Sequence, residues 1–456
     1  MDLMAWLNLA IFAATIGVVI RGRLDSSVAA LLGVAAMVWA GAMSEVDAFL
    51  AVDWNVMAIL ISIWIIAGYF GKTGVPEWLS VQALRLSGGR GGVLVMLLSF
   101  LAGIMSVFVD NVVVILMLAP VALPLARQLR LPLTPVILMI GFSANFMGTA
   151  LLLGDLPPQM LHSVSGAEFM DFIWQSGRPS SFPILIVTFV ITLGFMYIYG
   201  FRQTARESQE RNPLIGAVAG NPGNPGTAAD NREPAEAVVS IGRFAVLVVG
   251  GFLATIVAMA FREALNVKLG FIAMTGALML ILVLEVFGKT LEKPSFEEIL
   301  KELDWRAVFF YIALFALVGG LEKTGILEKL ATALTPLFAK NLALGATVLY
   351  WVTVPIAGVV EHDAYILTFL YTIRDLSQPA VEKWPLWWML VWSGTLGSNL
   401  TVAGAPALYV ALNICEREEG RKVSMREFLA WSVPFTLIAS GICYLFGMFI
   451  WVLHYS

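Results

Sequence analysis

Titratable side chains interrupt two otherwise apolar stretches of this sequence. FVDNVVVILMLAP contains Asp110 and Asn111, and GVVEHDAYILTF contains Glu361, His362 and Asp363. A charged group inside an apolar span is energetically costly, so by default it marks a functional site. Carboxylates bind small cations, and a triplet of titratable groups can exchange protons near neutral pH. These residues are the first candidates for ion binding.

Two more apolar stretches are broken by clusters of Gly, Ser, Thr and Asn, namely SANFMGTALLLGD from Ser143 and SGTLGSNLTVAGA from Ser393. Such residues make an interruption of a membrane helix tolerable, and the freed backbone groups and helix ends can bind ions. Any single Gly or Ser could instead serve close helix packing, so the inference depends on the clusters. The further candidates are Asn145, Thr149 and Asp155 in the first cluster, and Ser398, Asn399 and Thr401 in the second.

The composition indicates an all-α polytopic membrane protein. Of the 456 residues, 59% are hydrophobic and only 13% are charged, which lies outside the range of soluble domains. Apolar runs long enough to cross a bilayer recur along the chain, and they lack the alternation of a β-barrel. We expect the first run to be a span rather than a removable signal peptide. Cys415 and Cys443 form no metal-ligand pattern or disulfide framework.

Several functional classes are disfavoured by what the sequence lacks. It contains no Walker loop and no nucleophile elbow, so we expect neither an enzyme nor a cofactor. No basic stripe with interleaved aromatic residues suggests nucleic acid. No structural metal is expected, although a transported sodium ion could bind the candidate residues themselves.

An internal repeat predicts the architecture. DWNVMAILISIWIIAGYFGKTG, from Asp53, and DWRAVFFYIALFALVGGLEKTG, from Asp304, share Asp-Trp and Lys-Thr-Gly at an offset of 251 residues. The same offset relates Asp110 and Asn111 to Glu361 and His362, and an offset of 250 relates the two polar clusters. We therefore expect a first repeat at 1–201, a flexible cytoplasmic linker at 202–241 rich in Gly, Pro and Ala, and a second repeat at 242–456.

Each repeat is predicted to contribute five crossing helices and one re-entrant hairpin, about ten crossings in all. This arrangement puts 20 of the 28 basic residues on one face, which is then cytoplasmic, and both termini on the other. SEVDAFLAVD has no basic residue, whereas its counterpart GKTLEKPSFEEILKELD is rich in lysine, so the repeats should be inverted. The predicted crossings are 4–20, 28–43, 55–71, 134–153, 182–200, 242–261, 267–287, 307–321, 385–406 and 430–453, with hairpins at 92–126 and 343–373.

Alternatives remain for several of these residues. Asp110 could lie in a loop at the far face rather than at a hairpin tip, or be a structural carboxylate paired to a backbone break. The triplet at 361–363 could line an outer vestibule. Lys72 and Lys323 are expected to extend to the membrane interface, and Trp384, Trp387 and Trp388 to form an interfacial belt.

The motifs VDNVVVILMLAPV, ANFMGTALLLGDLPP, LVGGLEKTGILEKLA and GSNLTVAGAPALYVA resemble the ion transporter superfamily, in particular its arsenite permease and NhaD-type sodium/proton antiporter branch. The resemblance covers nearly the whole chain apart from the linker. It implies inverted repeats, re-entrant hairpins, a dimer with elevator transport, and binding by the candidates that match its motifs. The chain departs from the usual pattern at Met147 and Gln159, and Glu361-His362 replaces a Ser-Asn pair, which bears on the substrate more than on the fold.

Three functions follow for a multi-pass protein of a bacterial-type inner membrane. The first is a secondary transporter that exchanges sodium or another cation for protons, which suits the carboxylates at the breaks. The second is a permease for arsenite, another oxyanion or a carboxylate, because neutral clusters at helix N-termini can bind anions. A channel or a non-transporting membrane partner is the third, and it is disfavoured because inverted repeats serve alternating access.

Overall fold

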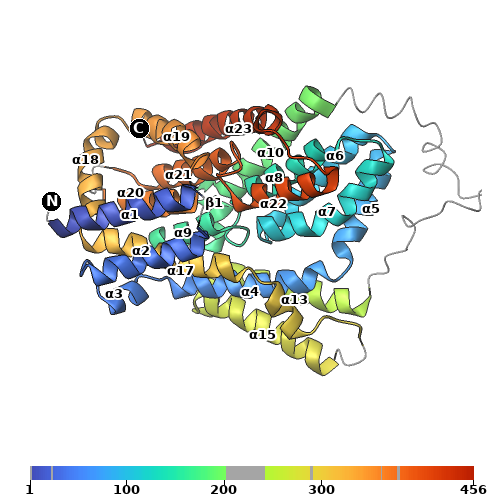
Figure 1. Cartoon of the computed structure of the whole chain (residues 1–456), viewed down its shortest axis with the longest axis horizontal. Coiled ribbons are helices and arrows are strands. Elements are labelled where there is room, and N and C mark those ends of the chain that lie inside the picture. The colour runs from blue at the N-terminus through green and yellow to red at the C-terminus, as the bar shows by residue number, and fades with distance from the viewer. Residues whose placement is uncertain are drawn as a thin grey trace, which may run out of the picture.

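The protein is a bundle of α-helices that lie mostly along one common direction (Figure 1). The computed structural model describes residues 3–21, 24–201, 242–287, 291–360, 362–376 and 381–455. Strands in this part of the chain are confined to a two-residue antiparallel hairpin, in which Trp174 pairs with Pro179. The all-α polytopic class predicted from the sequence is confirmed. The predicted linker at 202–241 lies outside the described residues.

Seven helices in the described ranges are long and apolar enough to cross a membrane. They are α4 (Trp54–Gly71), α7 (Asn111–Gln128), α10 (Ser181–Met196) with its π-helical extension to Phe201, α13 (Arg243–Ala260), α15 (Leu269–Phe287), α17 (Trp305–Lys323), and α23 (Met425–Gly447) with its π-helical extension to Val452.

Further helices complete the bundle. The apolar ones are α1 (Leu3–Arg21), α2 (Ser26–Trp39), α6 (Gly91–Ser106), α8 (Leu133–Met147), α19 (Leu342–Ala357) and α21 (Trp384–Ser398). The others are α3 (Glu45–Leu50), α5 (Val75–Ser87), α9 (Leu156–Ser165), η1 (Phe169–Phe172), α14 (Arg262–Leu265), α16 (Phe296–Glu302), α18 (Ile326–Lys340), α20 (His362–Arg374) and α22 (Pro406–Glu419).

Polar capping residues set where the helices begin. The side chain of Asp53 accepts bonds from the backbone N–H groups of Asn55 and Val56 at the start of α4. Asp304 does the same for Ala307 at the start of α17. Each cap satisfies backbone donors that have no partner within the helix, which matters most where water is scarce.

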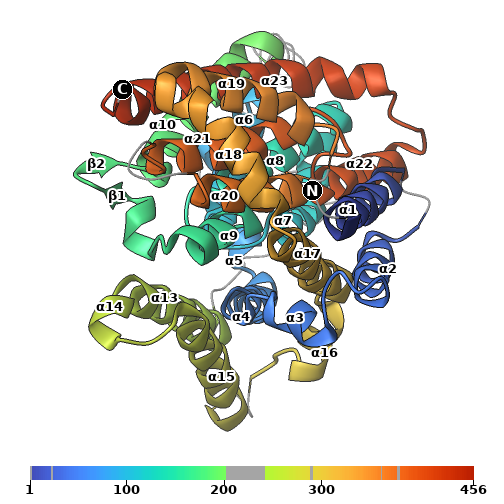
Figure 2. The ribbon, with the colours of Figure 1, turned by 90° about the vertical axis from the view of Figure 1, so that its left-hand side faces the viewer.

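The helices pack into two groups that draw on both halves of the chain. We call α1, α2, α4, α13, α15 and α17 the scaffold group, because α2 packs on α17, and α15 packs on α4 and α13. We call α6 to α10 and α19 to α23 the site group, because α6 packs on α8, α19 on α21, α22 on α8, and α10 on α23. Figure 2 shows the two groups on different sides of the bundle. Each predicted repeat therefore supplies helices to both groups.

Helices α4 and α17 run in opposite directions. Lys72, directly after α4, forms an ion pair of 2.7 Å with Glu302, just before α17. Reciprocally, Lys323 at the end of α17 pairs with Asp47, just before α4. Since each helix ends beside the start of the other, they must be antiparallel. Both lysines, which were predicted to extend to the membrane interface, are partly exposed and form ion pairs at these helix ends.

The same local hydrogen bonds recur 251 residues apart. The indole Nε1 of Trp54 donates to the carbonyl oxygen of Phe49 at 3.2 Å, and that of Trp305 donates to Leu300 at 2.9 Å. The helices before these tryptophans, α3 and α16, both open with a Ser capping box. The two segments are thus alike in structure as well as in sequence.

Two details differ from the sequence prediction. The helices at the expected crossings 134–153 and 385–406 end early, at Met147 and Ser398, because the Gly-rich clusters stop them. A Pro-containing turn then starts the next helix, α9 or α22. The interfacial tryptophan belt is wrong for Trp387 and Trp388, which are 7% and 0% exposed. The Trp388 indole finds its partner inside the protein, donating to Gln175 at 2.9 Å.

Candidate functional site

Four interruptions of helices meet in the middle of the bundle. One separates α6 from α7, another α19 from α20, and the other two divide α8 from α9 and α21 from α22. In Figure 1, α7 and α22 lie in one half of the bundle and α9 and α20 in the other. Every interruption frees backbone donors and acceptors, so the centre is where ions could be bound.

Asp110 caps the start of α7 and also lines an internal cavity. Its Oδ1 accepts bonds from Val112 N–H at 2.9 Å and Val113 N–H at 3.3 Å. The residue is 9% exposed. The alternative that Asp110 is a structural carboxylate paired to a backbone break is thus partly right, because its Oδ1 bonds to the first turn of α7. Because Asp110 also lines the cavity, it remains available to an ion.

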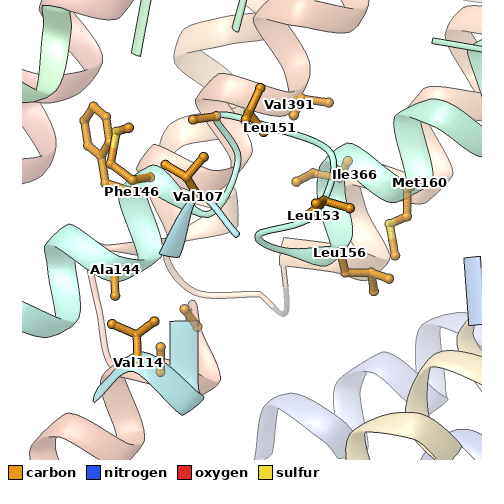
Figure 3. Packing of buried hydrophobic residues seen from close by; sticks show 14 of the residues in the cluster. Val107, Val114, Ala144, Phe146, Leu151, Leu153, Leu156, Met160, Ile366 and Val391 are labelled. Carbon is orange, nitrogen blue, oxygen red and sulfur yellow. The ribbon is translucent and has the colours of Figure 1, made fainter. Parts of the chain in front are cut away.

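Asp155 plays a similar part at the start of α9. Its Oδ1 accepts from the N–H of Leu156 at 2.9 Å, and its Oδ2 accepts from the side-chain amide of Asn111 at 3.0 Å. The loop before it runs from the end of α8, and Figure 3 shows Leu151 and Leu153 on this loop among buried apolar side chains. Apolar packing therefore fixes a polar turn, which orients the Asp155 carboxylate toward Asn111.

The two Gly-rich breaks touch each other through side chains. Asn145 accepts from Asn111 at 3.0 Å and donates to Ser398 Oγ at 2.9 Å and to Asn399 Oδ1 at 3.2 Å. Thr149 donates to the hydroxyl of Thr395 at 2.7 Å. All of these side chains are almost fully buried. A continuous polar network therefore links the first half of the chain to the second.

Two glycines let the breaks approach the hairpin tips. A Cβ on Gly154 would collide with the carbonyl oxygens of Ser106 and Gly148. A Cβ on Gly404 would collide with the carbonyl oxygen of Ser398. Because the obstructing atoms belong to the backbone, a side chain at either glycine cannot be accommodated by a rotamer change.

The interruption between α19 and α20 is followed by His362 and Asp363, at the start of α20. Both are about 1% exposed, and His362 Nε2 lies 3.4 Å from Asp363 Oδ1. Glu361, also predicted from the sequence, lies outside the described residues. Thr401 lies away from the cavity and donates to the carbonyl of Gly358, so it ties the second break to this hairpin.

A cavity of about 740 Å³ leads from these residues toward the end of the bundle at which α5 lies. Its inner end is formed by the site group and its opposite wall by α4 and α17 of the scaffold group. The residues at the inner end are Asp110, Asn111, Asp155, His362 and Asp363; the opposite wall includes Trp64, Gly68, Ala307 and Tyr311; and the mouth carries Lys72, Glu77, Glu302 and Asp304.

The cavity is strongly acidic. It is lined by six carboxylates and one basic side chain that is always charged, Lys72, which is already paired with Glu302. A low-dielectric cavity lined by one sign of charge concentrates ions of the other sign. Among the described residues, no three or more His, Cys, Asp or Glu side chains are close enough to hold a metal ion. A bound cation would therefore need amide, hydroxyl or backbone oxygens as well.

The structure unites most of the predicted residues but not all. Asp110, Asn111, Asp155, His362 and Asp363 face the cavity, while Asn145, Thr149, Ser398 and Asn399 form the network behind them. The scaffold wall was not predicted from the sequence, because Trp64 and Tyr311 lie in helices with no polar cluster. Asp304 could have been found through the repeated Asp-Trp motif.

The fold, the interrupted helices and the central cavity are together typical of a multi-pass membrane transporter. Comparison with known sequences agrees: residues 16–393 match the model of a family described as citrate transporters, and the chain belongs to this family. An uncharacterized transporter of Mycobacterium tuberculosis is 27% identical over 98% of this chain and 97% of its own length.

Two further relatives come from a cyanobacterial and a mammalian source. An uncharacterized transporter of Synechocystis is 23% identical over 98% of this chain and 97% of its own. The P protein of Homo sapiens is 24% identical over 86% of this chain, which corresponds to 53% of that protein. The broad membership in an ion transporter group is supported, whereas these matches do not single out the arsenite permease or NhaD-type branch.

Proposed function

We propose that this protein is a secondary active transporter that exchanges a cation, with sodium as the first candidate, for protons. The observation that carries the proposal is the acidic cavity ending at Asp110, Asp155 and Asp363. A carboxylate can hold either a metal cation or a proton, so the two compete for one site. Such competition couples their movements in opposite directions.

The architecture supports alternating access. Reciprocal ion pairs make α4 and α17 antiparallel, as inverted repeats require. The starts of α7 and α20 at Asn111 and His362 fit the tips of two re-entrant hairpins. In such transporters, one group of helices moves against the other around a central site, and the scaffold and site groups are suited to this motion.

A carboxylate permease is the second candidate, favoured by the description of the family. The geometry places a condition on it. Backbone N–H groups at the start of a helix can bind an anion when they have no other partner. At the starts of α7 and α9, such groups already donate to Asp110 and Asp155. A carboxylate substrate would therefore meet negative charge, and it would have to enter together with a cation or after the site is protonated.

Purified protein in proteoliposomes distinguishes these functions. A pH gradient is imposed, and sodium, lithium, arsenite or citrate is added with and without a divalent cation while internal pH is followed. The antiporter proposal predicts that sodium or lithium alone dissipates the gradient, and that Asp110→Asn and Asp363→Asn abolish the response. If only citrate does so, the permease is correct; if no addition does and both variants behave as wild type, the proton-linked proposal fails.

A further inference from the structure

Two equivalent pairs of helices adopt different arrangements. The offsets of the repeat relate α4 to α17 and α9 to α22. Helix α9 packs directly against α4. Helices α17 and α22 instead face each other across the cavity, which is lined by Ala307 and Tyr311 from one side and by Pro406 and Val410 from the other. The structure is thus closed at the first pair and open at the second.

Exposure of equivalent residues follows the same asymmetry. Asp304 and Arg306 are exposed and Ala307 is partly exposed at the start of α17. Their equivalents at the start of α4 are more buried: Asp53 and Asn55 are only partly exposed, and Val56 is 0% exposed. Helix α9 packs on this end of α4, and Gly270 of α15 also bonds to Asn55, whereas the start of α17 faces the cavity.

The closed pair is held by specific polar contacts between the two groups of helices. Ser163 of α9 donates its hydroxyl to Asp53 Oδ2, while Asp53 Oδ1 caps α4. Next to it, Asn55 Nδ2 lies 3.2 Å from His162 Nε2 of α9. Within the scaffold group, Asn55 Oδ1 also accepts from Gly270 N–H at 2.9 Å, which holds the Asn55 side chain in place.

A third contact extends the same seam. Arg262 of α14, which belongs to the scaffold side, forms an ion pair with Glu168 just after α9. Hydrogen bonds and a partly exposed ion pair can break and reform without unfolding either group, unlike an interdigitated apolar core.

We propose that Asp53, Asn55, His162 and Ser163 form the gate of a second aqueous route to the central site, which is closed in this structure. The route opens when the two repeats exchange their arrangements, so that α9 leaves α4 and α22 packs on α17. In that state Asp53 lines the mouth of the new cavity, as Asp304 lines the present one, and Val56 becomes accessible to water. The role of this gate depends on the transport function proposed above. Its location depends only on how α4, α9, α17 and α22 pack.

Paired cysteines test the gate in full-length protein that carries Cys415→Ala and Cys443→Ala. Asn55→Cys with His162→Cys is bridged by a short bis(methanethiosulfonate) reagent, which forms one disulfide with each cysteine, because these side chains meet at their tips. The single reporters are Val56→Cys and its equivalent Ala307→Cys, each labelled with a membrane-impermeant thiol reagent from either side. Without the bridge, we expect both reporters to be labelled, from opposite sides.

With the bridge in place, labelling at Val56→Cys should fall by about tenfold or more, because the crosslink removes the other state from the equilibrium. Labelling at Ala307→Cys should persist, and transport should stop until a reducing agent cleaves the bridge. The matched control is the equivalent pair Arg306→Cys with Leu412→Cys, which should trap the opposite state and protect Ala307→Cys instead.

The outcomes separate the gate from the substrate. If labelling behaves as described but no tested ion moves, the gate is correct and the cation proposal fails. If Val56→Cys is never labelled, or if the bridge leaves transport unchanged, the gate proposal is wrong. Should the paired variants fold poorly, Ser163→Ala serves instead: it removes one hydroxyl, and it should speed the labelling of Val56→Cys relative to the parent protein.

Discussion

The hydroxyl groups of Thr149 and Thr395 lie 2.7 Å apart, and their pairing repeats in a second, related contact. At the 250-residue offset of the repeat, Asn399 is equivalent to Thr149, and Asn145 is equivalent to Thr395. These two asparagines are also in contact, with Asn145 Nδ2 3.2 Å from Asn399 Oδ1. A pseudo-two-fold axis must therefore pass between the two pairs. The centre of the protein is the place where two copies of one segment meet face to face.

The stability losses from removing the two hydroxyls of the threonine pair should not be additive. Thr149→Val leaves Thr395 with a buried, unpaired hydroxyl, so we expect a loss of about 1 kcal/mol in the free energy of unfolding, and the same for Thr395→Val. The double variant should lose little more than either single one. Unfolding in detergent micelles, analysed as a double-mutant cycle, measures the coupling; strictly additive losses would mean that the hydroxyls do not interact.

The charge of Asp155 should matter for transport beyond its role as a helix cap. Asp155→Asn keeps an oxygen that can accept from Leu156 N–H but removes the negative charge, so the cation-dependent proton flux should fall by about tenfold or more. Glu77→Gln is the control, because that cavity-lining side chain belongs to α5 and caps neither α7 nor α9, and its effect should stay within about twofold at moderate salt. Equal losses in the two variants would contradict a special role for Asp155.

Substitution of the two break glycines should disrupt folding. Gly154→Ala and Gly404→Ala each force a methyl group against backbone carbonyls, and we expect losses of at least about 2 kcal/mol. Gly194 provides the contrast, since it lies within α10 with open space around its Cα. Gly194→Ala should leave stability unchanged or raise it by up to about 1 kcal/mol. Thermal melting of all three variants in one detergent decides the matter.

The ion pair between Asp47 and Lys323 should make stability sensitive to acid. The hydrogen bond from Lys323, with help from Ser44, holds the pKa of Asp47 well below its usual value. A carboxyl with a lowered pKa in the folded state stabilises the protein above its unfolded pKa, and that contribution disappears as the pH falls through the folded value. The melting temperature of the wild type should thus decline below about pH 4.

Lys323→Gln is the matched variant for this acid sensitivity. It should start with a slightly lower melting temperature at neutral pH and lose less on acidification, because Asp47 then titrates nearer its usual pKa. Both side chains are partly exposed, so the difference between the proteins should shrink in high salt. Parallel acid-induced declines in the two proteins at low salt would show that other groups control acid stability.

Much of the fold could be predicted because membrane helices leave a strong local signal. Apolar runs located α4, α13, α15 and α17, and the Gly, Ser and Asn clusters located both breaks. The pairing of Thr149 with Thr395 could not be predicted, since it depends on how the halves pack. Likewise, Trp388 reads as an interfacial residue until its burial against Gln175 is known. Local composition specifies where helices stop, whereas tertiary packing specifies which side chains meet there.

The pseudo-symmetry of the centre is broken at one consequential point. Asp155 and Ala405 are equivalent positions at the two breaks, so the negative charge belongs to only one of them. An ion that settles between the breaks is therefore drawn away from the axis, toward the first half of the chain. In the exchange cycle proposed above, the two half-cycles then start from unequal positions, so one direction of loading is favoured although both halves share one architecture.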